Sequence, residues 1–536
     1  MDIIILAAGL GSRLSKYTHN TIPKYLINID NYNGLYHLIT YWNQYANNIY
    51  LVINSKYNNI TNFYIKNLLT NYQEKIKIIN YDNSDGTAYT INYILNNDLK
   101  DNIINNLLIT WCDLYPIHNI NFNKIKKSKN DNNIYIFTNG NKCRYKLNDN
   151  NEIINCNSTS DGNIIGIYYF QNYKKFTLDD NCINNDIVSY LNNIGQIFNY
   201  KLDSIIDYGD EDKILDIFKN SNKSYNFNCR YFNNIEIIEN NKLFKKGIND
   251  KGKEIIKYEK NWYEYINNLN NNEITDILPK IYNIYEYGFI MEYKINYIPV
   301  YKYLIDNENN TDIKIKVLNN IIKKLDKIHQ IEKIEVSKLV FFNNLKKEIY
   351  DKIIERRNII LDLINHFNII ETVNNVKIDT FENILNKCKN IILTYYETIE
   401  EYQYSIILGD CQFSNILIDP SNNDNIVFID PRGYYGNSMI HGPSDYDYAK
   451  ILYGISGFDN FNFDHFNLKN IDLENKSIQF NIDGIYYDKK FINHYFNKVH
   501  KAYLVVIWLS LAEYNKNNIW KCLASYYYGL YLGTLL

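Results

Sequence analysis

The chain has 536 residues, of which 46% are hydrophobic and 22% are charged, and its formal net charge at pH 7 is −3. This length is too great for one compact core, so two or three domains are expected. The near-neutral charge excludes a nucleic-acid-binding protein that works through bulk positive charge. The hydrophobic fraction is typical of a soluble globular protein.

The cysteines and the apolar segments bear on the cellular compartment. The 8 cysteines, among them Cys112, Cys143, Cys229 and Cys411, include no CxxC pair, which favours reduced thiols over a disulfide or zinc framework. The chain opens with MDIIILAAG, a strand pattern and not a signal peptide. The apolar stretch 503–512 is too short to cross a bilayer and predicts a buried helix. We expect a cytoplasmic protein without stable membrane insertion. The sequence is compatible with an oligomer.

Residues 1–220 alternate short apolar runs with helical stretches, which is the βα pattern of a parallel sheet. The polar stretch 219–226 breaks this pattern and predicts a boundary between a domain of residues 1–220 and a domain of residues 221–536. The strands predicted in the first domain are 3–7, 49–53, 77–80, 107–110 and 134–138.

The second domain divides into two predicted lobes. Residues 228–295 are expected to form strands around one helix, and residues 296–536 to be mainly helical, with an apolar hairpin at 406–430. No internal repeat is visible. The expected fold class is therefore α/β with a mainly parallel sheet in the first domain, joined to an α+β second domain.

A glycine-rich turn, LAAGLGSRL at residues 6–14, follows the first predicted strand, and Pro23-Lys24 stands shortly after it. Glycines let the backbone approach a phosphate closely, and exposed N–H groups bind anions. Basic side chains can neutralise the triphosphate and the departing pyrophosphate. A dinucleotide-binding turn fits the glycine spacing and the Pro-Lys pair poorly. The predicted phosphate-binding residues are Ala8, Gly9 and Gly11, and the predicted catalytic cations are Arg13 and Lys24.

These motifs resemble the nucleotidyltransferase family of sugar-phosphate nucleotidylyltransferases and choline-phosphate cytidylyltransferases, over roughly the first 215 residues. The resemblance implies a Rossmann-like fold, an NTP donor such as CTP, and Mg²⁺. It implies that Asp113, in LLITWCDL, holds the metal, and that Asp207, in IIDYG, is the second metal carboxylate, although the Trp of the family segment is missing. Asp203 is a rival for that role. The alternatives are a strand-end cap for Asp113 and a solvated turn acid for Asp207.

Two carboxylates on one Mg²⁺ suit a reaction in which the metal bridges phosphates and no protein nucleophile is needed. The same resemblance implies that DGTA at residues 85–88, with Gly86 and Thr87, contacts the nucleotide base. It implies that the strand at 166–170 lines the acceptor pocket.

A second group of polar residues surrounds the predicted hairpin. Asp410 and Asn415 stand in ILGDCQFSNILI, and Asp430 closes the next apolar run in IVFIDPRG. Phosphoryl transfer needs a carboxylate for the acceptor hydroxyl, and an Asn and a carboxylate to hold Mg²⁺ on ATP. The spacing places these three groups at one end of a hairpin.

This region, residues 228–536, resembles the aminoglycoside-phosphotransferase and choline-kinase family, relatives of protein kinases with a bilobal fold. The resemblance implies Asp410 as the catalytic base and Asn415 and Asp430 as metal ligands. The usual His-Gly-Asp reads Leu408-Gly-Asp410 here, and that His normally braces the catalytic loop. Asp447 resembles the helix-start Asp that supports this loop.

The strand-rich lobe supplies the remaining kinase parts by the same resemblance. Lys245 or Lys246, with Lys245 preferred, resembles the phosphate-binding lysine, and Glu259 its helix partner, although a lone Lys–Glu pair can equally be a surface salt bridge. Glu292, in Met-Glu-Tyr, resembles the hinge whose backbone holds the adenine of ATP.

Both modules in this order resemble bifunctional proteins of capsule or surface-glycan biosynthesis. The resemblance implies that a small alcohol, choline-like or a sugar, is phosphorylated by ATP and then receives a nucleotidyl group from an NTP. One rival is a nucleotidyltransferase with a degenerate kinase-fold module for binding or assembly, favoured by Leu408. Another is a regulatory protein that senses nucleotides.

Overall fold

The computed structural model describes two compact units. Unit 1 comprises Met1–Ser224 and Asn365–Phe367, and unit 2 comprises Tyr225–Ile364 and Asn368–Leu536. The residues that the structure describes are 1–9, 11–29, 31–83, 86–100, 106–122, 125, 133–156, 162–171, 186–188, 191, 196–221, 233–239, 241–269, 271, 274–367, 369–463, 466–484, 487 and 489–536.

Unit 1 is built on a seven-stranded sheet of order β12-β8-β11-β6-β1-β4-β5. Its strands are β1 (Asp2–Ala7), β4 (Asn48–Ile53), β5 (Ile76–Asn80), β6 (Asn106–Trp111), β8 (Asn133–Cys143), β11 (Gly162–Gln171) and β12 (Gln196–Lys201). All neighbouring strands run parallel except β11, which is antiparallel to both β6 and β8. Every strand predicted from the sequence lies in this sheet, and the expected mainly parallel α/β architecture of the N-terminal part is confirmed.

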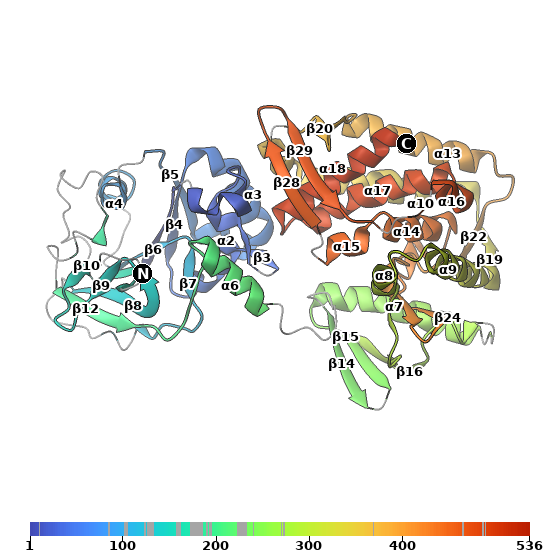
Figure 1. Cartoon of the computed structure of the whole chain (residues 1–536), viewed down its shortest axis with the longest axis horizontal. Helices are drawn as coiled ribbons and strands as arrows, with labels where there is room; N and C mark the ends of the chain where they lie inside the picture. Colours follow the sequence, from blue (N-terminus) through green and yellow to red (C-terminus); the bar gives the residue numbers. More distant parts are fainter. Residues whose placement is uncertain are drawn as a thin grey trace. The chain divides into compact units, whose positions relative to one another are not determined.

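Helices cover both faces of this sheet. In Figure 1, α4 (Thr87–Asn96) lies on one side, and α2 (Gly34–Asn43) and α3 (Asn58–Leu68) lie on the other. Strand β1 is consequently buried at all six residues, which explains why it reads as a continuous apolar run without alternation. The carboxyl ends of the parallel strands are left for the loops that carry the candidate residues.

Two short strands extend unit 1 beyond the main sheet. Strand β7 (Leu114–Pro116) follows β6 directly, and β13 (Ile205–Asp207) pairs with it in antiparallel fashion, with Asp207 opposite Leu114. Helix α6 (Glu211–Ser221) follows β13. This pairing joins two segments about ninety residues apart in the sequence.

The first part of unit 2 is a four-stranded antiparallel sheet of order β14-β15-β17-β16. Its strands are β14 (Asn233–Glu239), β15 (Lys242–Gly247), β16 (Ile281–Tyr285) and β17 (Gly288–Glu292). The long helix α7 (Asp250–Asn268) packs on β15 and β17. The arrangement is the one expected for residues 228–295, strands around one helix.

The rest of unit 2 is mainly helical and contains the expected hairpin. Strands β23 (Ile416–Asp419) and β24 (Asn422–Phe428) pair antiparallel, and β22 (Gln403–Ile406) precedes them. Helix α14 (Asp445–Ile455) packs against α17 (Lys498–Tyr514), which lies beside α18 (Ile519–Leu535) in Figure 1. The predicted buried helix at 503–512 lies within α17 and is confirmed.

One sheet in this part was not expected from the sequence. Strands β20 (Thr372–Val373), β21 (Val376–Lys377), β28 (Phe466–Asp472) and β29 (Ser477–Ile482) form a four-stranded sheet. The turn between β28 and β29 is fixed by Asp472, whose carboxylate accepts hydrogen bonds from the N–H groups of Glu474 and Asn475 at 3.1 and 2.9 Å. Such an Asx turn favours a hairpin where the composition suggests helix.

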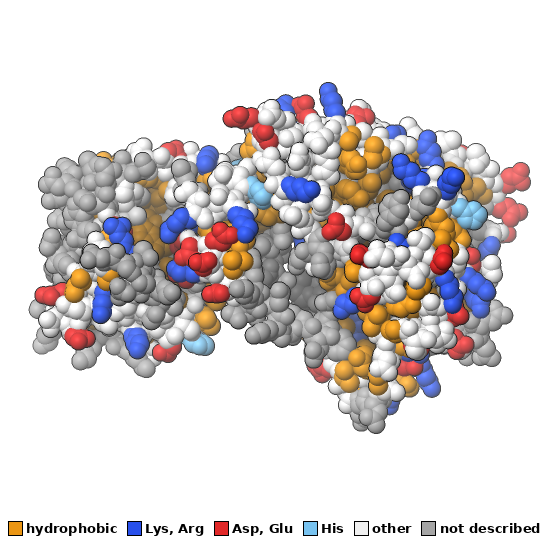
Figure 2. Space-filling view, in the orientation of Figure 1, with side chains coloured by type: hydrophobic (Ala, Val, Ile, Leu, Met, Phe, Trp, Pro, Cys, Tyr) orange, Lys and Arg blue, Asp and Glu red, His pale blue; other side chains and the backbone are white. Residues whose placement is uncertain are grey.

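The described helices include none that is both long and apolar enough to span a bilayer. Acidic and basic side chains are mixed over the face shown in Figure 2. The six cysteines in the described part of the chain are free thiols, and Cys182 and Cys229 lie outside that part.

Candidate active sites

The glycine-rich turn of unit 1 lies against Lys24. Ala8 and Gly9 follow β1, and Gly9 is exposed with nothing within 4 Å of the position that a Cβ would take. Gly11 has a φ of +68°, a left-handed conformation that favours glycine, and its Cβ position is 3.4 Å from Cβ of Lys24. The exposed Arg13 stands in the turn of helix that follows. The predicted phosphate turn and the predicted cation therefore adjoin.

Lys24 forms an ion pair with Asp113 at the end of β6. The two side chains are 19% and 9% exposed. Burial alone would lower the pKa of Lys24, but the Asp113 carboxylate raises it above its ordinary value. Two residues predicted separately, as a cation and as a metal ligand, thus meet at the carboxyl end of the sheet.

Asp207 reaches the same place through the β7–β13 pairing. Its neighbour Tyr208 donates its N–H to the carbonyl of Asp113 at 2.9 Å, and Gly209 follows. The Cβ position of Gly209 is 2.8 Å from Oδ2 of Asp113 and 3.2 Å from Oδ1 of Asp207. Both carboxylates therefore border one point, and a side chain at residue 209 would collide with them.

The charges around Asp207 show how the pair is held. Lys213 donates to Oδ2 of Asp207 at 2.7 Å, and the N–H of Gly209 donates to Oδ1 at 3.0 Å. Burial raises the pKa of Asp207 above its ordinary value, and the nearby Asp113 carboxylate adds to that rise. Two close carboxylates that repel one another are a fitting donor set for a hard divalent cation such as Mg²⁺.

The other predicted residues of unit 1 lie in different surroundings. Asp203, the rival of Asp207, is exposed. Gly86 has a φ of +84° and precedes the first turn of α4. The Thr87 hydroxyl donates to Asp186 at 3.2 Å and accepts from the N–H of Ile187 at 3.0 Å, so it already holds another segment. Asp85 lies outside the described residues.

One contact beside this site, between Gly166 and Trp111, was not predicted from the sequence. Gly166 has a φ of +77°, and the ring of Trp111 lies 1.9 Å from the position that its Cβ would take. Trp111 ends β6, two residues before Asp113. The strand predicted to line the acceptor pocket therefore carries a glycine that makes room for an indole, a relation that only the β6–β11 pairing reveals.

In unit 2, Lys245 is held between two carboxylates. Its Nζ lies 2.9 Å from Oε1 of Glu259 on α7 and 2.8 Å from Oδ1 of Asp430 after β24. The side chains of Lys245 and Glu259 are only 5% and 4% exposed. Burial alone would lower the pKa of Lys245, but Asp430 and Glu259 raise it. Lys246 points elsewhere, with Glu236 at 3.0 Å, as the alternation of a strand requires.

Asp430 and Asn415 stand at the same end of the hairpin. The N–H of Ile429 donates to the carbonyl of Asn415 at 2.9 Å. Asp430 has a φ of +56°, which is unusual for a residue other than glycine. The Asn415 amide donates to the main-chain carbonyl of Asp410 at 2.8 Å. Amide and carboxylate oxygens at this end suit Mg²⁺ in type.

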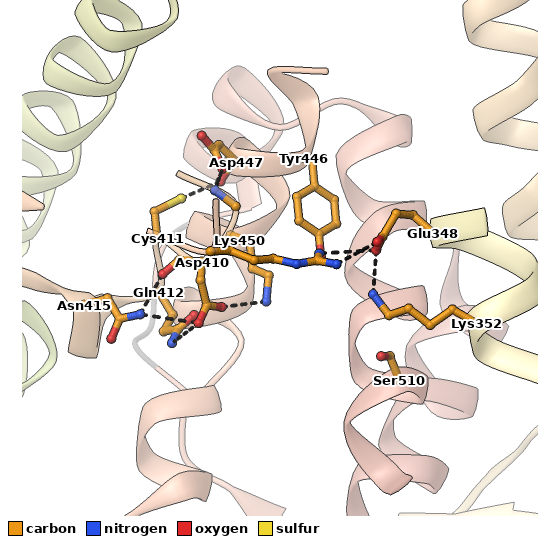
Figure 3. Close-up of polar contacts among 12 residues, drawn as sticks. Glu348, Lys352, Asp410, Cys411, Gln412, Asn415, Tyr446, Asp447, Lys450 and Ser510 are labelled. Carbon is orange, nitrogen blue, oxygen red and sulfur yellow. Dashed lines mark hydrogen bonds and ion pairs between the residues drawn. The ribbon is translucent and has the colours of Figure 1, made fainter. Parts of the chain in front are cut away.

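The Asp410 carboxylate has a basic partner that was not predicted. Lys450, on α14, donates to Oδ1 of Asp410 at 3.0 Å, and its side chain is 11% exposed (Figure 3). The Gln412 amide donates to Oδ2 at 3.3 Å. No spacing signal relates Lys450 to Asp410, because the two are forty residues apart.

The loop that carries Asp410 is braced by the fully buried Asp447. Its carboxylate accepts the N–H groups of Leu408 and Gly409 at 2.8 and 2.6 Å. His329 lies 3.0 Å from the same carboxylate, through Nε2. Two backbone donors and a histidine from α9 (Thr311–Ile331) therefore surround Asp447. Leu408 in place of His leaves the loop anchored.

A buried ionic group adjoins this loop. Arg432 donates to Glu348 at 2.6 Å and to the Tyr446 hydroxyl at 3.0 Å, and Lys352 donates to Glu348 at 2.5 Å. Figure 3 shows Glu348 and Lys352 across from Asp410 and Lys450, with Tyr446 between them. This group was not predicted from the sequence.

Glu292, predicted as part of a hinge, ends β17, and its groups are engaged. Its N–H donates to the carbonyl of Lys280 at 2.8 Å, and the N–H of Tyr293 donates to Asn241 at 2.7 Å. The Glu292 carboxylate pairs with Lys294 at 2.8 Å. An adenine here would have to use other backbone groups of this segment.

No family model and no curated protein matches this chain. Solved structures match its N-terminal part. A candidate glucose-1-phosphate thymidylyltransferase from Bacillus anthracis is 17% identical, with a TM-score of 0.35, over 43% of this chain and 98% of its own.

HddC from Yersinia pseudotuberculosis is 22% identical, with a TM-score of 0.33, over 41% of this chain and 99% of its own. The inositol-1-phosphate CTP transferase from T. maritima is 13% identical, with a TM-score of 0.33, over 41% of this chain and 96% of its own. At TM-scores this low, neither the reactions nor the substrates of these proteins extend to this chain.

Proposed function

We propose that the chain is a bifunctional enzyme that phosphorylates a small alcohol with ATP and then transfers a nucleotidyl group from an NTP to the phosphorylated product. Unit 1 carries the nucleotidyl transfer and unit 2 the phosphoryl transfer. The observation that carries this proposal is the convergence, in each unit, of a lysine with carboxylates from separate segments, Lys24 with Asp113 in one and Lys245 with Glu259 and Asp430 in the other.

In unit 1, a phosphate oxygen of the acceptor attacks the α-phosphorus of the NTP, and the bond to the bridging oxygen breaks to release pyrophosphate. The turn at Ala8, Gly9 and Gly11 binds the triphosphate, and Arg13 and Lys24 neutralise charge on the leaving group. Asp113 and Asp207 would hold Mg²⁺, which supplies charge neutralisation at the phosphates. By the family resemblance, Gly86 and Thr87 would contact the base of the NTP.

In unit 2, the acceptor hydroxyl attacks the γ-phosphorus of ATP, its proton passes to Asp410, and ADP leaves. Lys245, oriented by Glu259, binds the ATP phosphates. Asn415 and Asp430 would hold Mg²⁺, and the segment at Glu292 adjoins the adenine. The brace from Asp447 keeps Asp410 in place, which supports an active centre despite Leu408.

The test is an assay of the whole chain against a panel of NTPs, phosphorylated acceptors and alcohols. Pyrophosphate release reports unit 1, and alcohol-dependent ADP release reports unit 2. We expect both activities, with ADP release abolished in Asp410→Asn and pyrophosphate release retained. Pyrophosphate release without ADP release for any alcohol would assign unit 2 a binding or assembly role. Absence of pyrophosphate release with every acceptor would favour a nucleotide sensor.

A further inference from the structure

Four basic side chains of unit 2 lie near one another in a chain that reaches Asp410, and we call them the basic cluster: Lys352, Arg356, Arg432 and Lys450. Arg432 packs directly on the Asp410 loop. Its N–H donates to the carbonyl of Leu408 at 2.7 Å, and its Cβ lies 3.0 Å from the Cβ position of Gly409. Lys450 contacts Asp410 itself.

Aromatic and carboxylate contacts tie the cluster together. The Tyr446 hydroxyl bonds to Arg432, and Nζ of Lys450 lies 5.9 Å from the centre of the same ring. Glu348 joins Arg432 to Lys352. In Figure 3 the side chains of Lys450 and Lys352 lie on opposite sides of Tyr446, which separates them. The cluster is therefore contiguous with the group proposed to activate the acceptor.

Among the described residues, the four cations of the basic cluster have two carboxylate partners, Glu348 and Asp410. Glu348, 3% exposed, is shared by Arg432 and Lys352, while Asp410 pairs with Lys450. Arg356 donates to the carbonyl and the hydroxyl of Ser510, both at 2.8 Å, and neither acceptor carries a charge. Burial lowers the pKa of Lys352 to about 7, and the cations Arg432 and Arg356 contribute to that fall. An anion bound here would relieve this excess.

The backbone at the cluster is also irregular. The segment Lys347–Asp351, which carries Glu348, is a π-helical turn between α10 (Lys338–Lys346) and α11 (Lys352–Ile359). Turns of this kind within helices are frequent at functional sites. They reposition side chains at the cost of regular hydrogen bonding. Here the turn sets Glu348 and Lys352 beside Arg432.

We infer that the alcohol phosphorylated in unit 2 carries an anionic group, a carboxylate or a phosphate, that the basic cluster binds. The inference rests on the proposed phosphotransfer function and names its acceptor class. A cationic acceptor such as choline would place like charges together in a poorly solvated site. An anionic acceptor would gain charge-assisted hydrogen bonds while its hydroxyl lies at Asp410.

The experiment compares alcohols matched in size and different in charge, with the whole chain and Mg·ATP. One set is glycerate, glycerol phosphate, glycerol and aminopropanediol, and another is gluconate, glucitol and glucamine. We expect kcat/KM to be about ten- to a hundredfold higher for an anionic member than for its neutral counterpart. The two anions of the first set distinguish carboxylate from phosphate recognition.

Three variants locate the effect. Lys352→Met should raise KM for the anionic alcohol about tenfold or more, with KM for ATP unchanged, and Lys352→Arg should restore most of the affinity. Lys346→Met is the matched control, because Lys346 lies six residues before Lys352 and is 60% exposed. Calorimetric binding of each alcohol in the presence of Mg·ADP gives a readout that does not require turnover.

The outcomes separate this inference from the function on which it rests. Turnover of neutral or cationic alcohols in preference to anionic ones overturns the inference and leaves the kinase activity standing. An equal rise of KM for ATP in Lys352→Met also overturns it, because the cluster then serves the nucleotide. If the anionic alcohol binds, if this binding depends on Lys352, and if no turnover follows, then the anion site is supported and the proposed kinase activity is rejected. If none of the alcohols is bound and none is turned over, both the inference and the proposed function are overturned.

Discussion

The two candidate centres use the same pairing, a lysine held by a carboxylate, in different surroundings. In unit 1, Lys24 and Asp113 keep 19% and 9% of their side chains exposed. In unit 2, Lys245 is 5% exposed between Glu259 and Asp430. Unit 1 assembles its centre through strand pairing and close glycine contacts, and unit 2 through buried charges. Substitution of a charge should therefore impair chemistry in unit 1 and both folding and chemistry in unit 2.

The largest expected effect concerns Asp447. Asp447→Ala leaves two buried N–H groups without their acceptor and removes the partner of His329, which should destabilise unit 2 by about 3–5 kcal/mol. Hydrogen exchange of peptides from β22 and α14 should accelerate accordingly, while exchange in the β1 peptides stays unchanged. Asp424→Ala is the control, because Asp424 is 62% exposed and pairs with Lys316 at the surface. Unchanged exchange in α14 would contradict the comparison.

The next effect concerns Asp113. Asp113→Asn keeps the shape of the side chain and removes its charge, so pyrophosphate release should fall by about a hundred- to a thousandfold with unit 1 still folded. ADP release from unit 2 should not change. The check is a kinetic assay at saturating Mg²⁺ together with circular dichroism. Activity within about tenfold of the original would exclude Asp113 as a metal ligand.

Smaller losses are expected for the cations of unit 1. Lys24→Ala should slow nucleotidyl transfer by about ten- to a hundredfold, because it removes a charge-assisted contact to the departing pyrophosphate. Arg13→Ala should slow it by less, because Arg13 is exposed. Phosphoryl transfer in unit 2 should be unaffected in both variants. Steady-state rates of the two reactions measure this. Loss of both activities in a folded variant would show that the two centres are not independent.

The smallest effect is a pH dependence of stability from Asp207. Because its pKa is raised in the folded state above the ordinary value of 3.8, this carboxyl binds its proton more tightly when folded than when unfolded. Its contribution to stability is therefore greatest at low pH and is lost as pH rises from 3.8 through the folded pKa. Asp207→Asn should remove this component, and Asp203→Asn should not. Urea unfolding of unit 1 across that window, without Mg²⁺, measures the difference, and identical curves for Asp207→Asn and the original chain would refute it.

Several features of this protein could be predicted from local sequence. Continuous apolar runs placed five of the seven strands of the main sheet, because a parallel strand covered on both faces needs apolar residues at every position. Lys245 and Glu259 were predicted from order along the chain, and their contact in the structure is consistent with it. The sheet of β20, β21, β28 and β29 was not predicted, because strands β20 and β29 pair across more than a hundred residues.

The sequence by itself determined which chemical groups the protein has: the glycine turn, the cations, and the carboxylates at the ends of predicted strands. Only the tertiary structure decided which of them meet. The β7–β13 pairing brings Asp207 to Asp113, and the packing of α14 brings Lys450 to Asp410. Such contacts leave no periodic signal, because the free energy that forms them comes from burial and pairing of segments far apart in the chain. The grouping of the basic cluster in unit 2 belongs to this second class.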